Sequence, residues 1–182
     1  LLALRQGEIF ELKGEWKQAQ EHYEKSVASG GGSISLKKLA GIQLQRRQYD
    51  EAKKTIGKLK SLNSENEDVM LLEGILALRT GNPSGATSIF NRSPATPKSQ
   101  YGLALVAIAQ NDHEAAQKEL SLAAAGNDAT VRTYAKTILA AYDEFALFPN
   151  GQEVHRSTLL ARALAQVNEC ETALPLLTSV VL

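Results

Sequence analysis

The chain has 182 residues, of which 43% are hydrophobic and 22% charged, as in an ordinary soluble globular protein. Its formal net charge is zero, so no overall charge points to nucleic acid or to a membrane surface. The single cysteine, Cys170, excludes an intrachain disulfide, which fits either a reducing compartment or an exported bacterial protein. The longest apolar run, "YGLALVAIA" from Tyr101, is too short to span a bilayer, so we expect no membrane insertion.

The first predicted element is a pair of helices that meet at Gly14. The second helix of this pair, in "GEWKQAQEHY", carries Trp16 at the turn, Ala19 three residues later and Tyr23 four residues beyond that. A small residue at a helix crossing lets the two backbones approach closely, and the large residue one turn on fills the space beyond. We therefore predict an antiparallel helical hairpin.

The same spacing returns along the chain. The corresponding residues are Tyr49, Ala52 and Ile56, then Ala86 and Phe90, then His113, Ala116 and Leu120, and finally Cys170, Ala173 and Leu177. The alanines of the first four units lie 33, 34 and 30 residues apart, and the last alanine follows 57 residues later. The pattern predicts helical hairpins at a nearly regular interval.

Each hairpin contains a short turn, in "LKGEW", "RRQYD", "RTGNP", "AQNDH" and "QVNEC". A helix C-terminus favours a residue in the left-handed conformation, which Gly14, Gly81, Asn111 and Asn168 can adopt at low cost. Arg47 holds this place in the second turn and is the least suited of the five. We predict left-handed backbone at all five positions.

Prolines mark the irregular parts of the pattern. Pro94 and Pro97 should stop the second helix of the third unit early. Residues 128–148 look like one long helix without a hairpin partner, ended by "PNGQ". Pro175 falls inside the last helix and should kink it or delay its start.

Two amphipathic helices per roughly 34 residues are typical of one repeat family. The chain resembles the tetratricopeptide repeat (TPR) family on Gly7, Phe10, Gly14, Trp16, Ala19, Tyr23, Leu39, Tyr49, Ala52, Ile56, Gly74, Gly81, Ala86, Phe90, Leu103, Ala116, Leu120 and Ala123. The resemblance implies an all-α fold, a right-handed superhelical solenoid of antiparallel helix pairs. Its expected units are 1–32, 33–65, 66–96, 97–126, an irregular segment 127–151, and 152–182. "SGGGS" at residues 29–33 is the most flexible spot expected.

The two ends lack the caps and polar outer face of a finished solenoid. The sequence opens without methionine and stops inside an apolar helical pattern. We therefore interpret it as a fragment of a longer, bacterial TPR protein, soluble in the cytoplasm or the periplasm.

Catalytic motifs are missing from the sequence. The triple glycine at residues 30–32 lacks the Gly-Lys-Ser/Thr of a phosphate-binding loop, and neither G-x-G-x-x-G nor G-x-S-x-G occurs. His22, His113 and His155 fall in different units, so no set of four metal ligands converges. We expect no enzyme activity, no metal and no cofactor. His113 and Cys170 fill the turn position of Trp16, and we interpret both as packed side chains.

Positive charge is concentrated in the second unit. The basic residues there are Lys37, Lys38, Arg46, Arg47, Lys53, Lys54, Lys58 and Lys60. Such a run is usually a solvated helix face, and it could also meet an acidic partner. Nucleic acid is unlikely as a partner, because no aromatic residues are interleaved for base stacking.

The resemblance also implies that the first helices of successive units line a concave groove for a peptide or a partner helix. Helical spacing places on this face Ile34, Lys37, Gly41 and Leu44, then Asp68, Leu71, Ile75 and Leu78, then Lys98, Tyr101, Leu105 and Ile108. The apolar candidates for partner binding are Leu44, Leu71, Ile75, Leu78, Tyr101, Leu105 and Ile108. The Lys, Asn and Arg clamp with which family members grip acidic C-terminal tails is missing.

These observations favour a non-catalytic scaffold that binds another polypeptide through the groove. The competing interpretation is that the groove is filled, by absent repeats or by a second copy through self-association. Family analogy alone adds a regulatory or accessory segment of a larger enzyme, or a part of a bacterial secretion or pilus assembly protein. Nucleic-acid binding through the basic second unit is the least favoured alternative.

Overall fold

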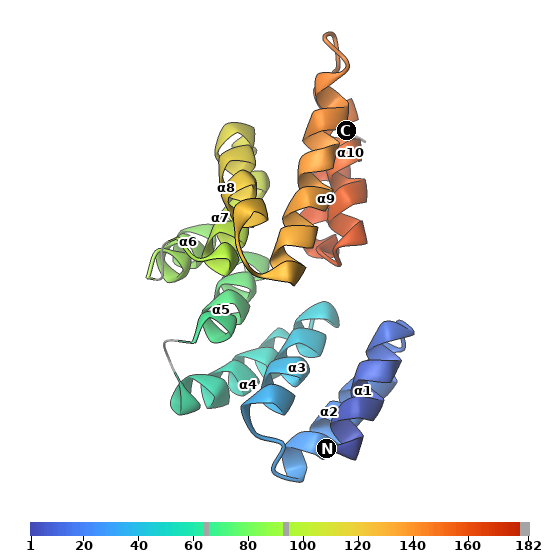
Figure 1. The fold of residues 1–182 in the computed structure, drawn as a ribbon, viewed down its shortest axis with the longest axis vertical. Helices are drawn as coiled ribbons and strands as arrows, with labels where there is room; N and C mark the ends of the chain where they lie inside the picture. The colour runs from blue at the N-terminus through green and yellow to red at the C-terminus, as the bar shows by residue number, and fades with distance from the viewer. Residues whose placement is uncertain (64–65, 93–94, 179–182) are drawn as a thin grey trace. The chain divides into compact units, whose positions relative to one another are not determined.

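The computed structural model describes residues 1–63, 66–92 and 95–178, and within these ranges every regular element is an α-helix (Figure 1). The helices are α1 (Leu2–Leu12), α2 (Trp16–Ala28), α3 (Gly32–Gln45), α4 (Tyr49–Leu62), α5 (Glu67–Arg79), α6 (Pro83–Phe90), α7 (Pro97–Ala109), α8 (His113–Ala125), α9 (Ala129–Ala146), α10 (Glu153–Gln166) and α11 (Cys170–Thr178). The prediction of an all-α helical repeat fold is confirmed.

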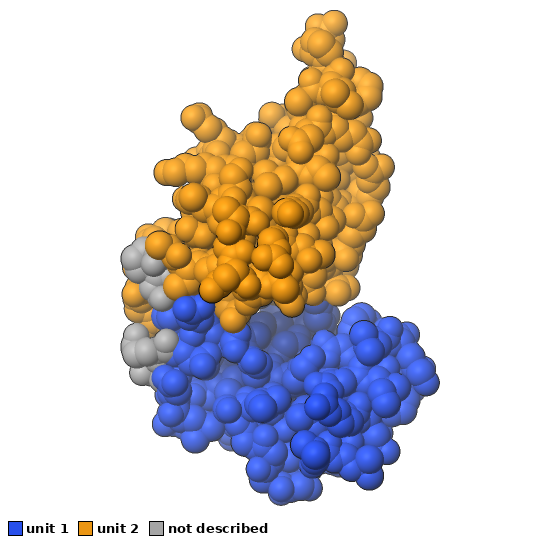
Figure 2. All heavy atoms as spheres, viewed as in Figure 1, with its two compact units in different colours: residues 1–76 blue, residues 77–182 orange. Residues whose placement is uncertain are grey.

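The helices form two compact units, residues 1–76 and residues 77–182, whose boundary falls within α5 (Figure 2). In the first unit α1 packs on α2, α2 on α3 and α3 on α4. In the second unit α6 packs on α7, α7 on α8, α8 on α9, α9 on α10 and α10 on α11. Neighbours in sequence are thus neighbours in space within each unit, as in a helical repeat protein. The right-handed superhelix stays a prediction.

All five hairpin turns have the left-handed residue that the sequence predicts. The φ angles are +73° at Gly14, +57° at Arg47, +79° at Gly81, +58° at Asn111 and +62° at Asn168. In each turn the following residue donates its backbone N–H to a carbonyl five residues back, as Glu15 does to Phe10 at 2.9 Å and Glu169 does to Leu164 at 2.8 Å. These Schellman-type bonds satisfy carbonyls at the end of the first helix.

The small residues at the helix crossings are buried. Ala19, Ala52, Ala86 and Ala116 are each 0% exposed, and the large residue four positions after each of them is buried as well. The last unit differs, because Leu176 is buried while Leu177 is 44% exposed. The expectation for Leu177 was therefore wrong. Positions three and four residues beyond Ala173 lie on the same helix face, and this helix uses the nearer one.

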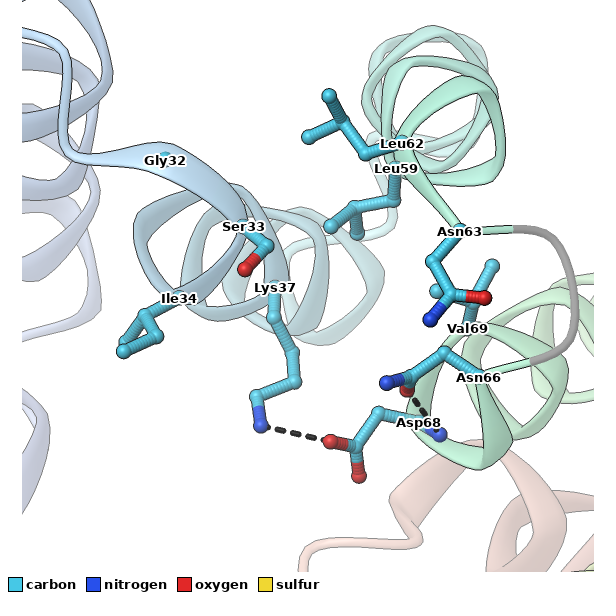
Figure 3. Close-up of a pocket in the computed structure, with 10 residues that line it drawn as sticks. All are labelled: Gly32, Ser33, Ile34, Lys37, Leu59, Leu62, Asn63, Asn66, Asp68 and Val69. Carbon is cyan, nitrogen blue, oxygen red and sulfur yellow. Dashed lines mark hydrogen bonds and ion pairs between the residues drawn. The ribbon is translucent and has the colours of Figure 1, made fainter.

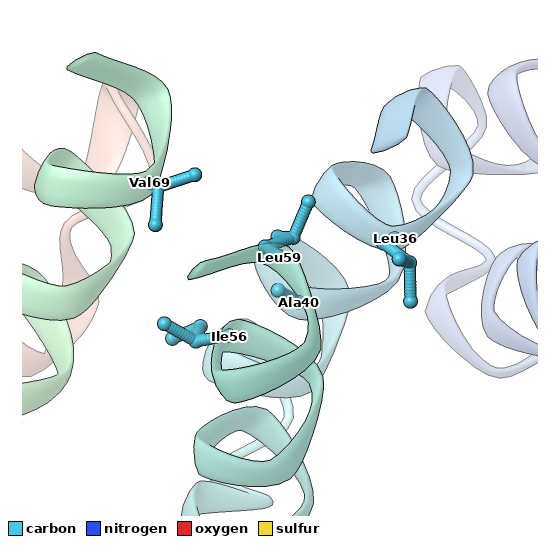
Figure 4. Close-up of a cluster of buried hydrophobic side chains, with 5 residues drawn as sticks. All are labelled: Leu36, Ala40, Ile56, Leu59 and Val69. Carbon is cyan, nitrogen blue, oxygen red and sulfur yellow. The ribbon is translucent and has the colours of Figure 1, made fainter. Parts of the chain in front are cut away.

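The core of the first unit lies between three helices. Leu36 and Ala40 of α3, Ile56 and Leu59 of α4 and Val69 of α5 form one buried cluster (Figure 4). Each helix is apolar on only one stripe, so the cluster is closed by side chains from all three. It anchors the first turn of α5 beside the ends of α3 and α4.

The irregular segments follow the sequence with some differences. α6 is short, as predicted, and ends at Phe90; Pro97 opens α7, and Pro94 lies outside the described residues. The long helix predicted over 128–148 is α9, but it packs against both α8 and α10, so the expectation that it lacks a hairpin partner was wrong. Pro175 does not delay α11, which begins at Cys170 and continues through the proline.

Candidate functional site

The first unit contains a pocket of about 440 Å³ where α3 begins, α4 ends and α5 begins (Figure 3). Its lining residues are Gly32, Ser33, Ile34, Lys37, Leu59, Leu62, Asn63, Asn66, Asp68 and Val69. This volume is within the range of small ligand sites, and the mixture of aliphatic and polar groups is typical of them. Ile34 and Leu62 are 56% and 62% exposed, so apolar surface continues beyond the pocket.

The "SGGGS" segment positions the first turn of α3 in this pocket. Gly30 and Gly32 have φ angles of +80° and +64°, and a Cβ on Gly31 would overlap Ser26 and Ser35. These two serines share a buried hydrogen bond of 2.7 Å between their Oγ atoms. The segment that the sequence marks as the most flexible spot thus forms a turn whose backbone and close packing favour glycine.

Charged and polar groups fix the other wall of the pocket. Lys37 Nζ lies 2.7 Å from Asp68 Oδ2, which joins α3 to the first turn of α5 (Figure 3). Asn66 Oδ1 accepts a hydrogen bond of 2.9 Å from the backbone N–H of Asp68 and so caps α5. The pocket therefore has an aliphatic floor at Leu59 and Val69 and a fixed ion pair on its wall.

The seven predicted groove residues divide by burial. Leu44, Tyr101, Leu105 and Ile108 are at most 2% exposed and Ile75 is 9% exposed, whereas Leu71 and Leu78 are partly exposed. The expectation of exposed groove side chains was therefore wrong for the buried residues. Leu44 and Ile75 belong to a core cluster with Ala52 in the first unit. Of the three apolar groove candidates in the first unit, Leu44, Leu71 and Ile75, only Leu71 is partly exposed.

The burial of Tyr101, Leu105 and Ile108 follows from the surroundings of α7. This helix contacts α6, α8, α9 and α11, so it has neighbours on several sides. The run "YGLALVAIA" is apolar around the whole helix, which is the pattern of a helix buried on all faces. That signal was present in the sequence and went unused.

Three of the eight residues in the predicted basic patch form ion pairs with neighbouring carboxylates. Lys37 pairs with Asp68, Lys38 Nζ lies 3.0 Å from Glu11, and Lys60 Nζ lies 2.6 Å from Glu73. Arg46 donates a 2.6 Å hydrogen bond to Gln20, and Arg47 forms the left-handed turn. Lys53, Lys54 and Lys58 remain exposed on α4. Three of the eight residues are thus in ion pairs, three lie on one solvated helix face, and the two arginines have local roles at the turn.

The histidines and the cysteine have the following surroundings. His113 Nδ1 lies 3.1 Å from the Tyr142 hydroxyl, and burial is the main cause that lowers the pKa of this histidine. His22 stacks on Phe10, and His155 meets Phe148 edge-on. Cys170 is exposed, so its interpretation as a packed side chain was wrong.

Within the described ranges, the chain has neither a cluster of metal-ligating side chains nor a helix suited to cross a membrane. No group of three or more metal-ligating side chains occurs among residues 1–63, 66–92 and 95–178. No helix in the same ranges is both long enough and apolar enough to cross a membrane.

Sequence reasoning missed a buried polar cluster in the second unit. Arg79 Nη2, at the end of α5, lies 2.9 Å from Glu169 Oε2, in the turn before α11, and their side chains are only 4% and 9% exposed. Burial raises the pKa of Glu169, and Arg79 opposes that shift. Glu169 follows the left-handed residue, as Glu15 and Asp112 do in their turns, so the repeat pattern gave no reason to expect its burial.

This architecture defines the class: a TPR-like helical repeat protein. No family model and no curated protein matches the chain by sequence. A tetratricopeptide repeat protein from Parabacteroides merdae is similar in structure, with a TM-score of 0.55 and 15% identity over 98% of this chain and 77% of that one. The MamA protein is also similar, with a TM-score of 0.51 and 14% identity over 99% of this chain and 88% of that one. At this identity the similarity concerns the fold.

Proposed function

We propose that the chain is a non-catalytic scaffold that binds another protein, and that an aliphatic side chain of the partner enters the pocket between α3, α4 and α5. TPR-like folds generally mediate protein–protein interaction, and solenoids offer extended surfaces for this purpose. One observation carries the choice of surface. Ile34, Lys37 and Asp68 line the pocket, and helical spacing had placed these same residues on the partner-binding face.

The chemistry of the pocket favours a peptide segment over a polar metabolite. Its floor is aliphatic, and the exposed side chains of Ile34 and Leu62 extend the apolar surface outward. Lys37 and Asp68 are already paired with each other, so the wall offers little net charge to a charged ligand. An aliphatic residue with polar neighbours in an extended or helical segment matches this combination.

The proposal is tested by selecting peptides from a random library on the purified protein and measuring their affinity by calorimetry. We expect Ile34→Asp to weaken the selected peptides by about tenfold or more, because the charge would be desolvated at the pocket rim. The matched control is Leu12→Asp, at an 89% exposed leucine on α1 in the same unit, and it should leave the affinity unchanged. Equal affinity of the Ile34→Asp variant would place the binding surface elsewhere.

A further inference from the structure

In the second unit, other helices cover the face of α7 that carries the predicted groove residues. Tyr101, Leu105 and Ile108 of α7 are at most 2% exposed, and α9 and α11 both contact this helix. The ring of Tyr101 lies 6.1 Å from that of Tyr134 in α9. Helices of the same chain therefore occupy the face that the repeat pattern assigns to a partner.

Glu169 is the charged contact that holds α11 in this position. Its carboxylate accepts a hydrogen bond from Arg79, 90 residues earlier in the chain, and it also lies within electrostatic range of Tyr101. Both side chains of this ion pair are buried, at 4% and 9% exposed. The start of α11 is thus fixed by one buried charge pair next to α7.

This pair is incompletely satisfied. Arg79 Nε and Nη1 and the Tyr101 hydroxyl are buried without a hydrogen-bond partner among the described residues. Removing both charges from water costs free energy that only good geometry and additional hydrogen bonds offset. Docking of α11 therefore keeps three polar groups unpaired, and these would regain water if α11 moved away.

α11 is itself a weak helix. Pro175 lies inside this helix and lacks the N–H that would bond to the carbonyl of Glu171. Leu174 and Leu177 are 43% and 44% exposed, so part of its apolar surface remains unburied. A helix interrupted by a proline depends on its packing partners to persist.

We propose that the face of α7 next to Arg79 and Tyr101 is a second interaction surface, that α11 covers it as an intramolecular occupant, and that its external ligand is an amphipathic helix beginning with a carboxylate. Such a ligand reproduces what Glu169 and α11 supply, and a carboxylate in two-point contact would also reach the donors of Arg79 that Glu169 leaves unpaired. This surface lies in the second unit, so the inference does not depend on the pocket of the first unit.

The probe is a synthetic peptide of residues 167–178 with Cys170→Ser, and the control peptide also carries Glu169→Gln. Both are titrated into the full chain and into its Glu169→Gln variant, which weakens the internal contact and leaves Arg79 and Tyr101 in place. We expect the probe to bind this variant about tenfold more tightly than it binds the unaltered chain. The reason is that α11 of the variant competes less well with the probe for the face of α7. The control peptide should bind at least tenfold more weakly than the probe.

A distance measurement follows α11 directly. Cys170 is the only cysteine, so spin labels at Cys170 and at Gln110→Cys, at the end of α7, report the position of α11 relative to α7. The unaltered chain should give one narrow distance, and Glu169→Gln should add a second, longer one that grows as the probe is added. Glu144→Gln removes the exposed pair with Arg162 and serves as the matched control, with no second distance.

Glu169→Asp is a second variant for the case that Glu169→Gln does not fold, because it keeps the charge and shortens its reach. It should change the probe affinity and the spin-label distance in the same direction as expected for Glu169→Gln. The inference is overturned if the probe binds neither protein, if the probe and the control peptide bind equally, or if the distance distribution is the same in all variants. Failure of the Ile34→Asp test would leave these readouts unaffected, so the two proposals fail separately.

Discussion

Single residues in the turns determine where each helix of a pair ends. Four of the five left-handed positions carry glycine or asparagine, which adopt this backbone at low cost, whereas Arg47 adopts it at φ +57° with a full side chain. The hydrogen bond from Gln48 N–H to the Gln43 carbonyl, at 2.9 Å, is formed all the same. Arg47 therefore holds its turn at a local energetic cost that its neighbours offset.

The strain at Arg47 leads to the first prediction. Arg47→Gly should be more stable than Arg47→Ala by about 1 kcal/mol, because both remove the side chain and only glycine relieves the left-handed backbone. Urea denaturation followed by circular dichroism measures the difference. At the matched turn, Gly81→Ala should lower the free energy of unfolding by about 1 kcal/mol. Equal stability of the two Arg47 variants would show that the turn is unstrained.

Asp128 supplies the second prediction at this scale. Its Oδ1 accepts a hydrogen bond of 3.0 Å from the backbone N–H of Val131, and this bond is the main cause that lowers the pKa of the carboxyl. A lowered folded pKa means that the stabilisation is present above the unfolded value and is lost as the pH falls through the folded value. Asp128→Ala should lower the free energy of unfolding by about 1 kcal/mol at pH 7.

The pH dependence separates the charge of Asp128 from its capping geometry. Asp128→Asn keeps an acceptor for α9 and loses the 3.2 Å contact with Lys98, so it should be less destabilised than the alanine variant at pH 7. As the pH falls below about 4, the unaltered chain should approach the asparagine variant in stability. Denaturation curves at pH 7 and pH 3 check this. An equal difference in the free energy of unfolding between the unaltered chain and Asp128→Asn at both pH values would contradict it.

At the scale of helices, glycines set how closely a neighbouring helix can approach. A Cβ on Gly7 would overlap the ring of Tyr23 in α2, and a Cβ on Gly102 would overlap the ring of Phe90 in α6. A Cβ on Gly41 in α3 would have no atom of another residue within 4 Å. The same residue type thus has different reasons to be present in different units.

The third prediction uses this contrast. Gly102→Ala should lower the free energy of unfolding by about 1–3 kcal/mol, because the helices must separate to admit the methyl group. Gly41→Ala should raise it by up to about 1 kcal/mol, because alanine is the better helix former and the site is open. Thermal and urea denaturation of the two variants test the opposite signs. A stabilised Gly102→Ala variant would mean that Phe90 moves aside without cost.

The predictability of this fold differs between elements for physical reasons. Turn residues and small crossing residues act within about 35 residues of sequence, so their pattern gave the hairpins and all five left-handed positions. The burial of Tyr101 depends on α9 and α11, which local periodicity does not locate. The Arg79–Glu169 pair spans 90 residues and carries no motif, and the pocket was anticipated only as the face containing Ile34, Lys37 and Asp68.

At the scale of the whole molecule, the protection of backbone amides from hydrogen exchange should depend on the number of neighbouring helices rather than on helix length. α7 has four helical neighbours and is apolar around its surface, whereas α1 exposes Leu2, Ile9 and Leu12. Stability in repeat proteins is distributed over such neighbour contacts.

The fourth prediction is therefore that the backbone amides of α7 exchange with deuterium most slowly and those at the start of α1 exchange fastest. Mass spectrometry of peptic fragments after hydrogen exchange measures both in one experiment. The longer helix α9, with 18 residues, serves as the internal control for helix length. Slower exchange in α9 than in α7 would show that burial by neighbours does not govern protection here.

The long separation between Arg79 and Glu169 also has a consequence during synthesis on the ribosome. Most contacts of the chain join adjacent helices and can form as soon as each hairpin emerges, but Arg79 must wait for a residue made 90 positions later. At about 5–20 residues per second, this leaves its guanidinium without its carboxylate for roughly 5–20 s. The nascent chain therefore passes through a period in which its earlier hairpins are complete and this cation still faces water, available to any carboxylate nearby.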